Sequence, residues 1–285
     1  MQKSASKSGF NVFVTNLCLA DLLMGVYSVI IGVADELFRG RYMYHDTAWK
    51  SSAACKVAGF LSLLSSEVSA LTIWLITLDH FIVLRFPFSS WRFQRGSAAA
   101  ACLMTWLVGC ALAAVPLLPM TSHWEFYGQT GICIPLPVTR RDFEGRSYSF
   151  GVMIILNFIL FLLIAAGQGF IYWSVQQNAM TTDTTRKSRD GTIARRLVTV
   201  AVTDFLCWFP IGVCGLMALA GVSIPGEINV AMAVFVLPLN SALNPFLYTF
   251  NLVTEKRKKA SEERLLKKLQ SSILSKVTDA DSHNE

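Results

Sequence analysis

The sequence predicts an all-α membrane protein in which six helices cross the bilayer. Of its 285 residues, 53% are apolar and only 15% are charged, whereas soluble domains carry about 25% charged residues. A crossing needs about 20 mostly apolar residues, and six such stretches lie at 10–33, 53–84, 98–118, 149–175, 194–220 and 228–250. A large apolar core in a soluble protein is the alternative, but this chain has too little polar surface to cover one.

The first span follows a short basic segment, residues 1–9, which lacks the cleavage site of a removed signal peptide. The second and fourth spans are long enough to project beyond the bilayer. The last span holds residues that interrupt regular hydrogen bonding, namely Pro238, Asn240, Asn244, Pro245 and Tyr248. A proline removes a backbone donor, and nearby polar side chains can satisfy the freed groups. This pattern is typical of a moving part of a membrane protein.

Lysine and arginine placement predicts the orientation and the domains. Segments 1–9, 85–97, 176–196 and 251–285 hold 18 of the 25 basic residues, so we expect both termini in the cytoplasm. The net charge of +6 then reflects contact with anionic membrane lipid rather than nucleic acid. We expect an inner-loop remnant at 1–9, a bundle at 10–250, an amphipathic helix on the membrane at 251–270 and a disordered cytoplasmic tail at 271–285. For 251–270, a solvated charged tail is the alternative.

Two of the seven cysteines, Cys55 and Cys133, lie on the predicted outer side, where an oxidising environment permits a disulfide. Two free thiols are the alternative. In the outer loop 119–147, the string FYGQTGICIPL is aromatic and β-branched with glycines at turn positions. We therefore expect a short β-hairpin there.

Three acids, Asp21, Glu67 and Asp204, lie inside apolar spans. Each costs on the order of 3 kcal/mol at mid-bilayer, so each should face the bundle interior with a partner. For Asp21 we expect Ser69, Asn240 and Asn244 as partners. Such oxygen ligands suit a small cation or water, and a protonated, hydrogen-bonded core acid is an equally good interpretation.

The string Cys207-Trp208-Phe209-Pro210 places a large ring next to a proline kink in the fifth span, where Trp208 and Pro210 could act as a hinge. An aromatic residue that simply packs is the alternative. Nothing in the sequence predicts an enzyme. The four histidines have no metal-ligand spacing among them, and no phosphate-binding loop or nucleophile elbow is present.

The chain resembles the rhodopsin-like G-protein-coupled receptors over about residues 1–260. Within them it is most similar to the leucine-rich-repeat subgroup that contains the relaxin-family peptide receptors. The strings LADLLMGVY, SSEVSALTIWLITLDHF, FYGQTGICIPL, TDFLCWFPI and LPLNSALNPFLYT carry the resemblance. The last contains an Asn-Pro-x-x-Tyr motif, here Asn244 to Tyr248.

The resemblance implies six of the seven receptor helices and a role for each group of residues. Cys55 would be bridged to Cys133, and Asp21, Ser69, Asn240 and Asn244 would form a sodium and water pocket, the only metal site or cofactor implied. The implied activation switch consists of Asp204, Trp208, Pro210, Pro245 and Tyr248, with Asp204 bonded to an asparagine of the last span. The implied inner coupling face contains Asp79, His80, Arg195 and Arg196. Two departures are His80 where the family has arginine and Gln168 where it usually has tyrosine.

The resemblance implies a plasma-membrane receptor that binds a relaxin-like peptide or protein hormone and activates a heterotrimeric G protein. The sequence contains neither the first receptor span nor the repeat-containing ectodomain, so we expect it to be a fragment that signals poorly by itself. A truncated, non-signalling or modulatory form is therefore an alternative. A six-span transporter or channel is weaker, because no inverted repeat or selectivity-filter motif is found.

Overall fold

The computed structural model describes residues 2–86, 93–134, 144–178, 199, 202–203, 205–218, 220–222, 224–236, 238–243 and 261. Within these residues every regular element is a helix, which confirms the predicted all-α class. The chain divides into two units, 1–245 and 246–285. The predicted amphipathic helix and tail lie outside the described residues, apart from Ser261. Everything below concerns the first unit.

The elements follow one another as α1 (Gln2–Phe38), α2 (Tyr42–Ser51), α3 (Ala53–Arg85), α4 (Arg95–Ala114), η1 (Val115–Leu117), η2 (Ser122–Trp124), η3 (Phe126–Gln129), α5 (Arg146–Phe150), η4 (Gly151–Leu156), α6 (Asn157–Asn178), α8 (Gly226–Ala231) and η5 (Met232–Val236). A further apolar helix covers Phe205–Ala218. Elements η1 to η3 are 3-10 turns, whereas η4 and η5 are π-helical.

Four helical stretches are long and apolar enough to cross a membrane: Gly9–Phe38, Ala53–Arg85, Arg95–Leu117 and Arg146–Ser174. They match the first four predicted spans. For the fifth span, 194–220, the structure describes the helix Phe205–Ala218 and little else. For the sixth, 228–250, it describes α8, η5 and a helical turn at 238–243, and residues beyond 243 lie outside the description.

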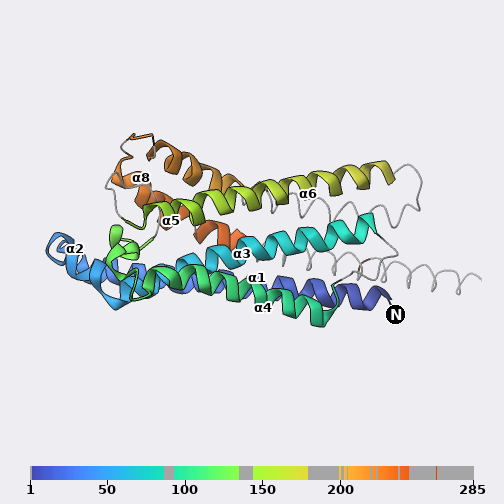
Figure 1. Cartoon of the computed structure of the whole chain (residues 1–285), viewed down its shortest axis with the longest axis horizontal. Coiled ribbons are helices and arrows are strands. Elements are labelled where there is room, and N and C mark those ends of the chain that lie inside the picture. Colours follow the sequence, from blue (N-terminus) through green and yellow to red (C-terminus); the bar gives the residue numbers. More distant parts are fainter. Residues whose placement is uncertain are drawn as a thin grey trace, which may run out of the picture. The chain divides into compact units, whose positions relative to one another are not determined.

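Helix α3 is the centre of the described bundle and packs against α1, α4 and α6 (Figure 1). In its apolar window 78% of residues are buried, against 28–33% in the other three spans. Small residues let the neighbours approach closely. A Cβ atom on Gly109 of α4 would lie 2.7 Å from Val68 Cγ2 of α3. This close packing explains why the polar residues of α3 face other helices rather than lipid.

Local sequence signals set the helix ends. Helix α1 ends where Gly40 takes a φ of +71°, a conformation that glycine adopts without a Cβ clash. Helix α3 is N-capped by Ser52, whose side chain accepts a hydrogen bond of 3.1 Å from the backbone amide of Cys55. The side chains of Gln94 and Ser97 form a reciprocal capping box at the start of α4.

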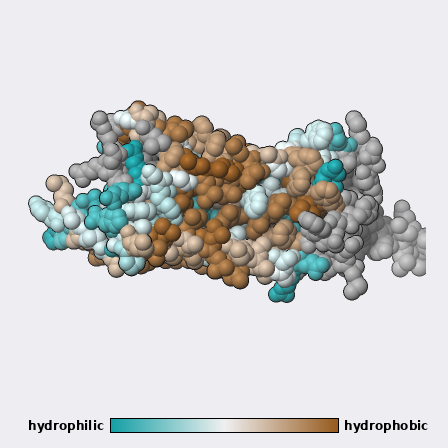
Figure 2. Space-filling view, viewed as in Figure 1, coloured by the Kyte–Doolittle hydropathy of each residue, from teal (hydrophilic) through white to brown (hydrophobic). Residues whose placement is uncertain are grey.

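Large apolar side chains cover the middle of the face shown in Figure 2, whereas hydrophilic residues gather at the end that holds α2. Leu22 and Val29 of α1 are 61% and 65% exposed, and Phe158 of α6 is 59% exposed. So much exposed apolar surface suits contact with lipid. We call the end of the bundle that holds α2 and the Cys55–Cys133 bond the disulfide end. We call the other end of the bundle the opposite end.

The predicted β-hairpin is not seen in the described part of the outer loop, residues 119–134 and 144–147, where no strand forms. Phe126–Gln129 forms a 3-10 turn instead. The reason is tertiary: Phe126 and Tyr127 are only 2% and 1% exposed. The Tyr127 hydroxyl donates a hydrogen bond of 2.7 Å to the carbonyl of Ala113 in α4. Both rings therefore enter the core, which an extended hairpin with one solvent face would not allow.

Candidate functional site

The disulfide end is closed by a bond between Cys55 and Cys133, which confirms the predicted pairing. Their Cα atoms lie 5.3 Å apart, within the usual range for a disulfide. Cys55 lies in the first turn of α3, and Cys133 has a φ of +56° in the outer loop. The bond fixes this loop to the most buried helix of the bundle.

Aromatic side chains add further links between the outer loop and the helices. Trp49 Nε1 of α2 donates to the Gly131 carbonyl at 2.7 Å. The Tyr27 hydroxyl of α1 donates to the Ile132 carbonyl at 2.9 Å. Together with the disulfide and the Tyr127 bond to α4, these contacts connect the loop to α1, α2, α3 and α4. The disulfide end is therefore preorganised.

The surroundings of Gly59 show that the disulfide end is tightly packed. A Cβ atom there would lie 2.2 Å from Tyr127 Cδ1 and 2.5 Å from the Cys133 carbonyl oxygen. We expect Gly59→Ala to lower the free energy of unfolding by about 1–3 kcal/mol, because overpacked cores must shift. Thermal unfolding in detergent measures this. Gly25→Ala is the matched control, since nothing lies within 4 Å of its Cβ position, and an equal loss in both variants would contradict the packing argument.

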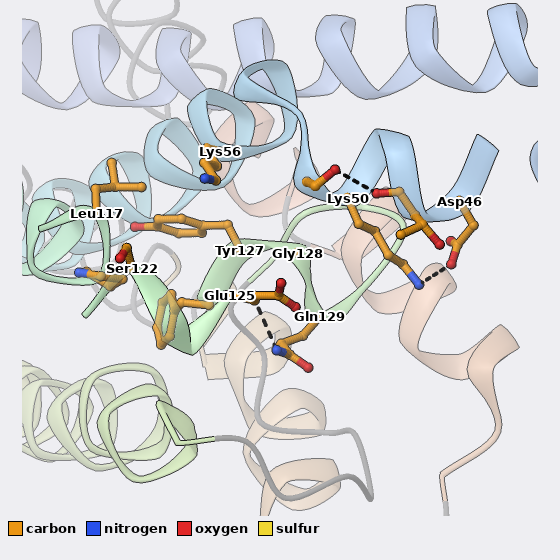
Figure 3. A pocket seen from close by; sticks show the side chains of 13 residues that line it. Asp46, Lys50, Lys56, Leu117, Ser122, Glu125, Tyr127, Gly128 and Gln129 are labelled. Carbon is orange, nitrogen blue, oxygen red and sulfur yellow. Dashed lines mark hydrogen bonds and ion pairs between the residues drawn. The ribbon is translucent and has the colours of Figure 1, made fainter. Parts of the chain in front are cut away.

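A pocket of about 420 Å³ opens at the disulfide end between α2, the start of α3 and the turns η1 to η3 (Figure 3). Its walls include the charged and polar residues Asp46, Lys50, Lys56, Glu125 and Gln129. Asp46 and Lys50 form an ion pair of 2.8 Å. Partial burial of Asp46 opposes ionisation, but hydrogen bonds from Lys50 and Tyr42 outweigh it and hold its pKa below the usual value. Among the described residues, no carboxylate lies within ion-pair distance of Lys56.

A second polar site lies inside the bundle between α1 and α3. The Ser69 hydroxyl donates a hydrogen bond of 2.8 Å to Asp21 Oδ1, and both residues are buried. One turn away, the Ser65 hydroxyl donates to the Ala20 carbonyl at 2.8 Å. Asn240, expected in the same pocket, is also buried at 6% exposure. The structure thus brings Asp21 and Ser69 together, while Asn244 lies outside the described residues.

Glu67 is fully buried in α3, as expected of an acid inside a span. Asn157, the first residue of α6, donates a hydrogen bond of 2.9 Å from Nδ2 to Glu67 Oε1. The same Nδ2 lies 3.2 Å from the Val152 carbonyl and 3.4 Å from the Met153 carbonyl, both within the π-helical turn η4. Asn157 therefore joins α3 to a helical turn whose carbonyls lack regular α-helical bonds.

One buried network was not predicted from the sequence. Asn16 Nδ2 donates to the Thr72 hydroxyl at 2.8 Å, and Trp106 Nε1 donates to Asn16 Oδ1 at 2.7 Å. It joins α1, α3 and α4. The one signal in the sequence was an asparagine within an apolar span, five residues before Asp21.

The expected hinge residues Trp208 and Pro210 are half-buried in the helix Phe205–Ala218, and Trp208 packs against the core. Their expected partners in the switch, Asp204, Pro245 and Tyr248, lie outside the described residues. The structure therefore places these two residues, while the hinge itself and the expected bond from Asp204 to Asn240 or Asn244 stay predictions.

At the opposite end, the expected coupling residues Asp79 and His80 lie in the last two turns of α3. Asp79 is buried at 4% exposure. His80 Nδ1 lies 3.0 Å from the Ile76 carbonyl of its own helix, and its ring meets the edge of Phe10 in α1. His80 therefore contacts α1, and Arg195 and Arg196 lie outside the described residues.

Gln168 of α6, the second departure from the family pattern, is buried at 4% exposure. Its Nε2 donates a hydrogen bond of 2.9 Å to the Thr77 hydroxyl of α3. The described residues contain no group of three or more His, Cys, Asp or Glu side chains that could hold a metal ion.

Comparison with known proteins places this arrangement in a family. Residues 1–248 match the family model described as 7 transmembrane receptor (rhodopsin family). The chain is 41% identical over 238 residues to G-protein coupled receptor GRL101 of Lymnaea stagnalis, covering 84% of this chain and 21% of that protein. It is 36% identical over 236 residues to relaxin receptor 2 of Canis lupus familiaris, covering 82% of this chain and 32% of that receptor.

Human relaxin receptor 1 is 36% identical over 239 residues, which cover 83% of this chain and 32% of the receptor. The chain thus spans between a fifth and a third of the length of these relatives. The family match covers all four membrane-length helices, the disulfide and the buried polar residues of α1 and α3. The chain belongs to the rhodopsin family of seven-transmembrane receptors and is related to the relaxin receptors.

Proposed function

We propose that this chain forms the membrane-spanning part of a receptor for a relaxin-like peptide or protein hormone. In this proposal, ligand binding at the disulfide end shifts the bundle between two packings, and the second packing activates a heterotrimeric G protein at the opposite end. The observation that carries the proposal is the 36% identity to relaxin receptor 2 across the membrane-spanning bundle.

The proposal places the chain in the plasma membrane with the disulfide end outside. Disulfides persist in oxidising extracellular surroundings. The excess of lysine and arginine in the segments 1–9, 85–97, 176–196 and 251–285 supports cytoplasmic termini. The opposite end then faces the G protein, with Asp79, His80, Arg195 and Arg196 as the proposed coupling residues.

The pocket in Figure 3 suits contact with a peptide at the outer surface. Its volume of about 420 Å³ lies within the range of ligand sites. Lys56 supplies a positive charge that no described carboxylate neutralises. An acidic group on the hormone or on the ectodomain that presents it would complement this charge.

The buried pair Asp21 and Ser69 fits a sodium ion chemically, because a carboxylate and a hydroxyl are the hard oxygen donors that such a cation prefers. In the proposal, Asn240 and Asn244 complete the oxygen set. A bound sodium ion would supply positive charge that offsets the buried carboxylate and favours the packing in which these groups converge. The chain's own contribution is to hold Asp21 in place through Ser69.

Replacing Asp21 tests this ion site. We expect Asp21→Asn to abolish the sodium dependence of thermal stability, because the amide carries no charge to attract a cation. Unfolding temperatures measured in sodium chloride and in choline chloride at equal ionic strength give the comparison. Ser65→Ala is a control that removes a nearby hydroxyl bonded to the Ala20 backbone. An unchanged sodium dependence in Asp21→Asn would mean that Asp21 is a satisfied core acid without an ion.

The proposed switch lies where the last two spans meet. Trp208 and Pro210 form the hinge, and Asp204 restrains it through a bond to Asn240 or Asn244. Pro245 and Tyr248 allow the end of the last span to rearrange, since a proline weakens the helical turn before it. Breaking the Asp204 bond would favour the signalling packing.

Second-messenger output in cells tests the proposed function. The chain would be expressed alone and joined to the ectodomain and first span of relaxin receptor 2, and both would be treated with a relaxin-like peptide. We expect a response from the joined form and little or none from the chain alone. No response from a surface-expressed joined form would contradict the receptor function. An equally strong response from both would refute a truncated, modulatory role for the chain alone.

A further inference from the structure

The hydrogen bond between Gln168 and Thr77 joins α6 to α3 toward the opposite end. Gln168 Nε2 donates to Thr77 Oγ1 at 2.9 Å, and both residues are at least 96% buried. The Thr77 hydroxyl donates its own hydrogen to the Ile73 carbonyl at 3.0 Å. Thr77 can therefore only accept from Gln168, which fixes the orientation of the amide.

The helices are packed tightly around this bond. A Cβ atom on Gly167 would lie 2.6 Å from Thr77 Cγ2. One turn further along, the rings of Phe81 and Phe170 meet with centroids 4.9 Å apart. Glycine at 167 is thus needed for the approach that brings Gln168 and Thr77 into hydrogen-bonding distance.

Two described polar side-chain bonds join α3 to α6. The first links Glu67 to Asn157, and the second links Thr77 to Gln168, ten or eleven residues further along. That separation corresponds to about 15 Å along a helix. The described contacts of His80 are with Ile76 of its own helix and Phe10 of α1 rather than with α6. The Thr77–Gln168 bond therefore restrains this half of α6 against α3.

The free energy gained from this hydrogen bond is opposed by an unsatisfied polar atom in the same Gln168 side chain. Gln168 Oε1 is buried and has no hydrogen-bond partner in the described part of the chain. A buried carbonyl without a partner favours any packing that lets water reach it. Separation of the two helices would lose the bond from Nε2 but would hydrate Oε1, which offsets part of the free-energy cost of opening.

We propose that Thr77 and Gln168 form a latch that keeps α3 and α6 together at the opposite end and releases when the bundle changes packing. The idea that release of the latch admits a G protein rests on the proposed function. The idea that the latch controls the separation of α3 and α6 is independent of that function.

The sharpest variant is Thr77→Val, which keeps the shape of the side chain but leaves the Gln168 amide nitrogen buried without an acceptor. We expect the population with separated helices to rise about five-fold or more. Thr77→Ser keeps the hydroxyl and should behave like the wild type. Gln168→Met removes both the amide donor and the unpaired carbonyl, so in the Thr77→Val background it should restore the closed population.

Distances between spin labels measure the separation directly in the 285-residue chain in lipid nanodiscs. Arg85 of α3 and Trp173 of α6 are exposed and both lie toward the opposite end of the bundle. Cysteines at these two positions can carry the labels once the free cysteines are replaced, namely Cys18, Cys102, Cys110, Cys207 and Cys214. A longer-distance population that grows in Thr77→Val and disappears again in the double variant supports the latch. An unchanged distribution in folded Thr77→Val, or equal opening in Thr77→Ser, would overturn it.

Gly167→Ala provides a second route to the same result if Thr77→Val folds poorly. It keeps both polar groups but forces the Thr77 methyl group away, so it should also enlarge the open population. No increase in folded Gly167→Ala would count against the latch. Nucleotide exchange on a purified G protein, measured on the same variants in the joined receptor, separates the two proposals. Opening without faster exchange would leave the latch standing and contradict the coupling function.

Discussion

Cys55→Ser and Cys133→Ser are each expected to abolish cell-surface expression of the chain or of a receptor that contains it. The disulfide closes a segment with a sequence separation of 78 residues. A bridge of this span contributes about 3–5 kcal/mol on the chain-entropy model. Its loss would also release the outer loop from the most buried helix of the bundle, so the expected effect is a large part of the total stability.

Surface labelling at matched total expression measures this effect, with Cys110→Ser as the control because Cys110 is a free thiol. The double variant Cys55→Ser/Cys133→Ser should be no worse than either single variant, since both lose the same bond. Normal surface levels in either single variant would mean that the aromatic contacts alone hold the loop.

Asn157→Leu is expected to destabilise the bundle strongly, because it leaves the carboxyl of Glu67 buried without its donor. Loss of one partner from a buried polar pair costs about 1–3 kcal/mol. Asn157 also lies within hydrogen-bonding distance of the Val152 and Met153 carbonyls in the π-helical turn η4, so the turn loses a partner as well. Thermal unfolding of the purified chain in detergent provides the measurement.

A double-variant cycle separates the Glu67 pair from the helical turn. Glu67→Gln keeps an acceptor for Asn157 and should cost less than Asn157→Leu. Glu67→Leu combined with Asn157→Leu should recover part of the stability, because replacing both partners by apolar groups leaves no buried carboxyl unpaired. If the two leucine variants lost stability additively, the 2.9 Å contact would contribute nothing as a pair.

The long apolar helices and the disulfide could be predicted from the sequence. The helices depend on the local run of apolar residues, and the disulfide had few candidate cysteines. A run of about 20 apolar residues predicts a membrane crossing whichever other helices it packs against. Only two cysteines, Cys55 and Cys133, lie on the predicted outer side, which left one pairing to consider. The bond between Asp21 and Ser69 was predictable for a similar reason, since an acid in a span needs a nearby polar partner.

Contacts between helices distant in the chain were not predictable from local pattern. Asn157 is 90 residues from Glu67, and Gln168 is 91 residues from Thr77. Their pairing depends on the rotation of α6 against α3. The outer loop was predicted as a hairpin for the same reason: its composition favours strands, but burial of Phe126 and Tyr127 overrides that preference. Helix α2 is short and polar, and no span pattern marked it.

The central claim is that the two ends of the bundle are coupled, so that a hormone outside and a G protein inside favour the same packing. Such coupling must be reciprocal. The direct test is the affinity of a relaxin-like peptide for the joined receptor, measured in nanodiscs with and without nucleotide-free G protein. The account predicts that G protein tightens peptide binding by about 5- to 150-fold. An affinity that is identical in both conditions, with the G protein shown to be bound, would contradict it.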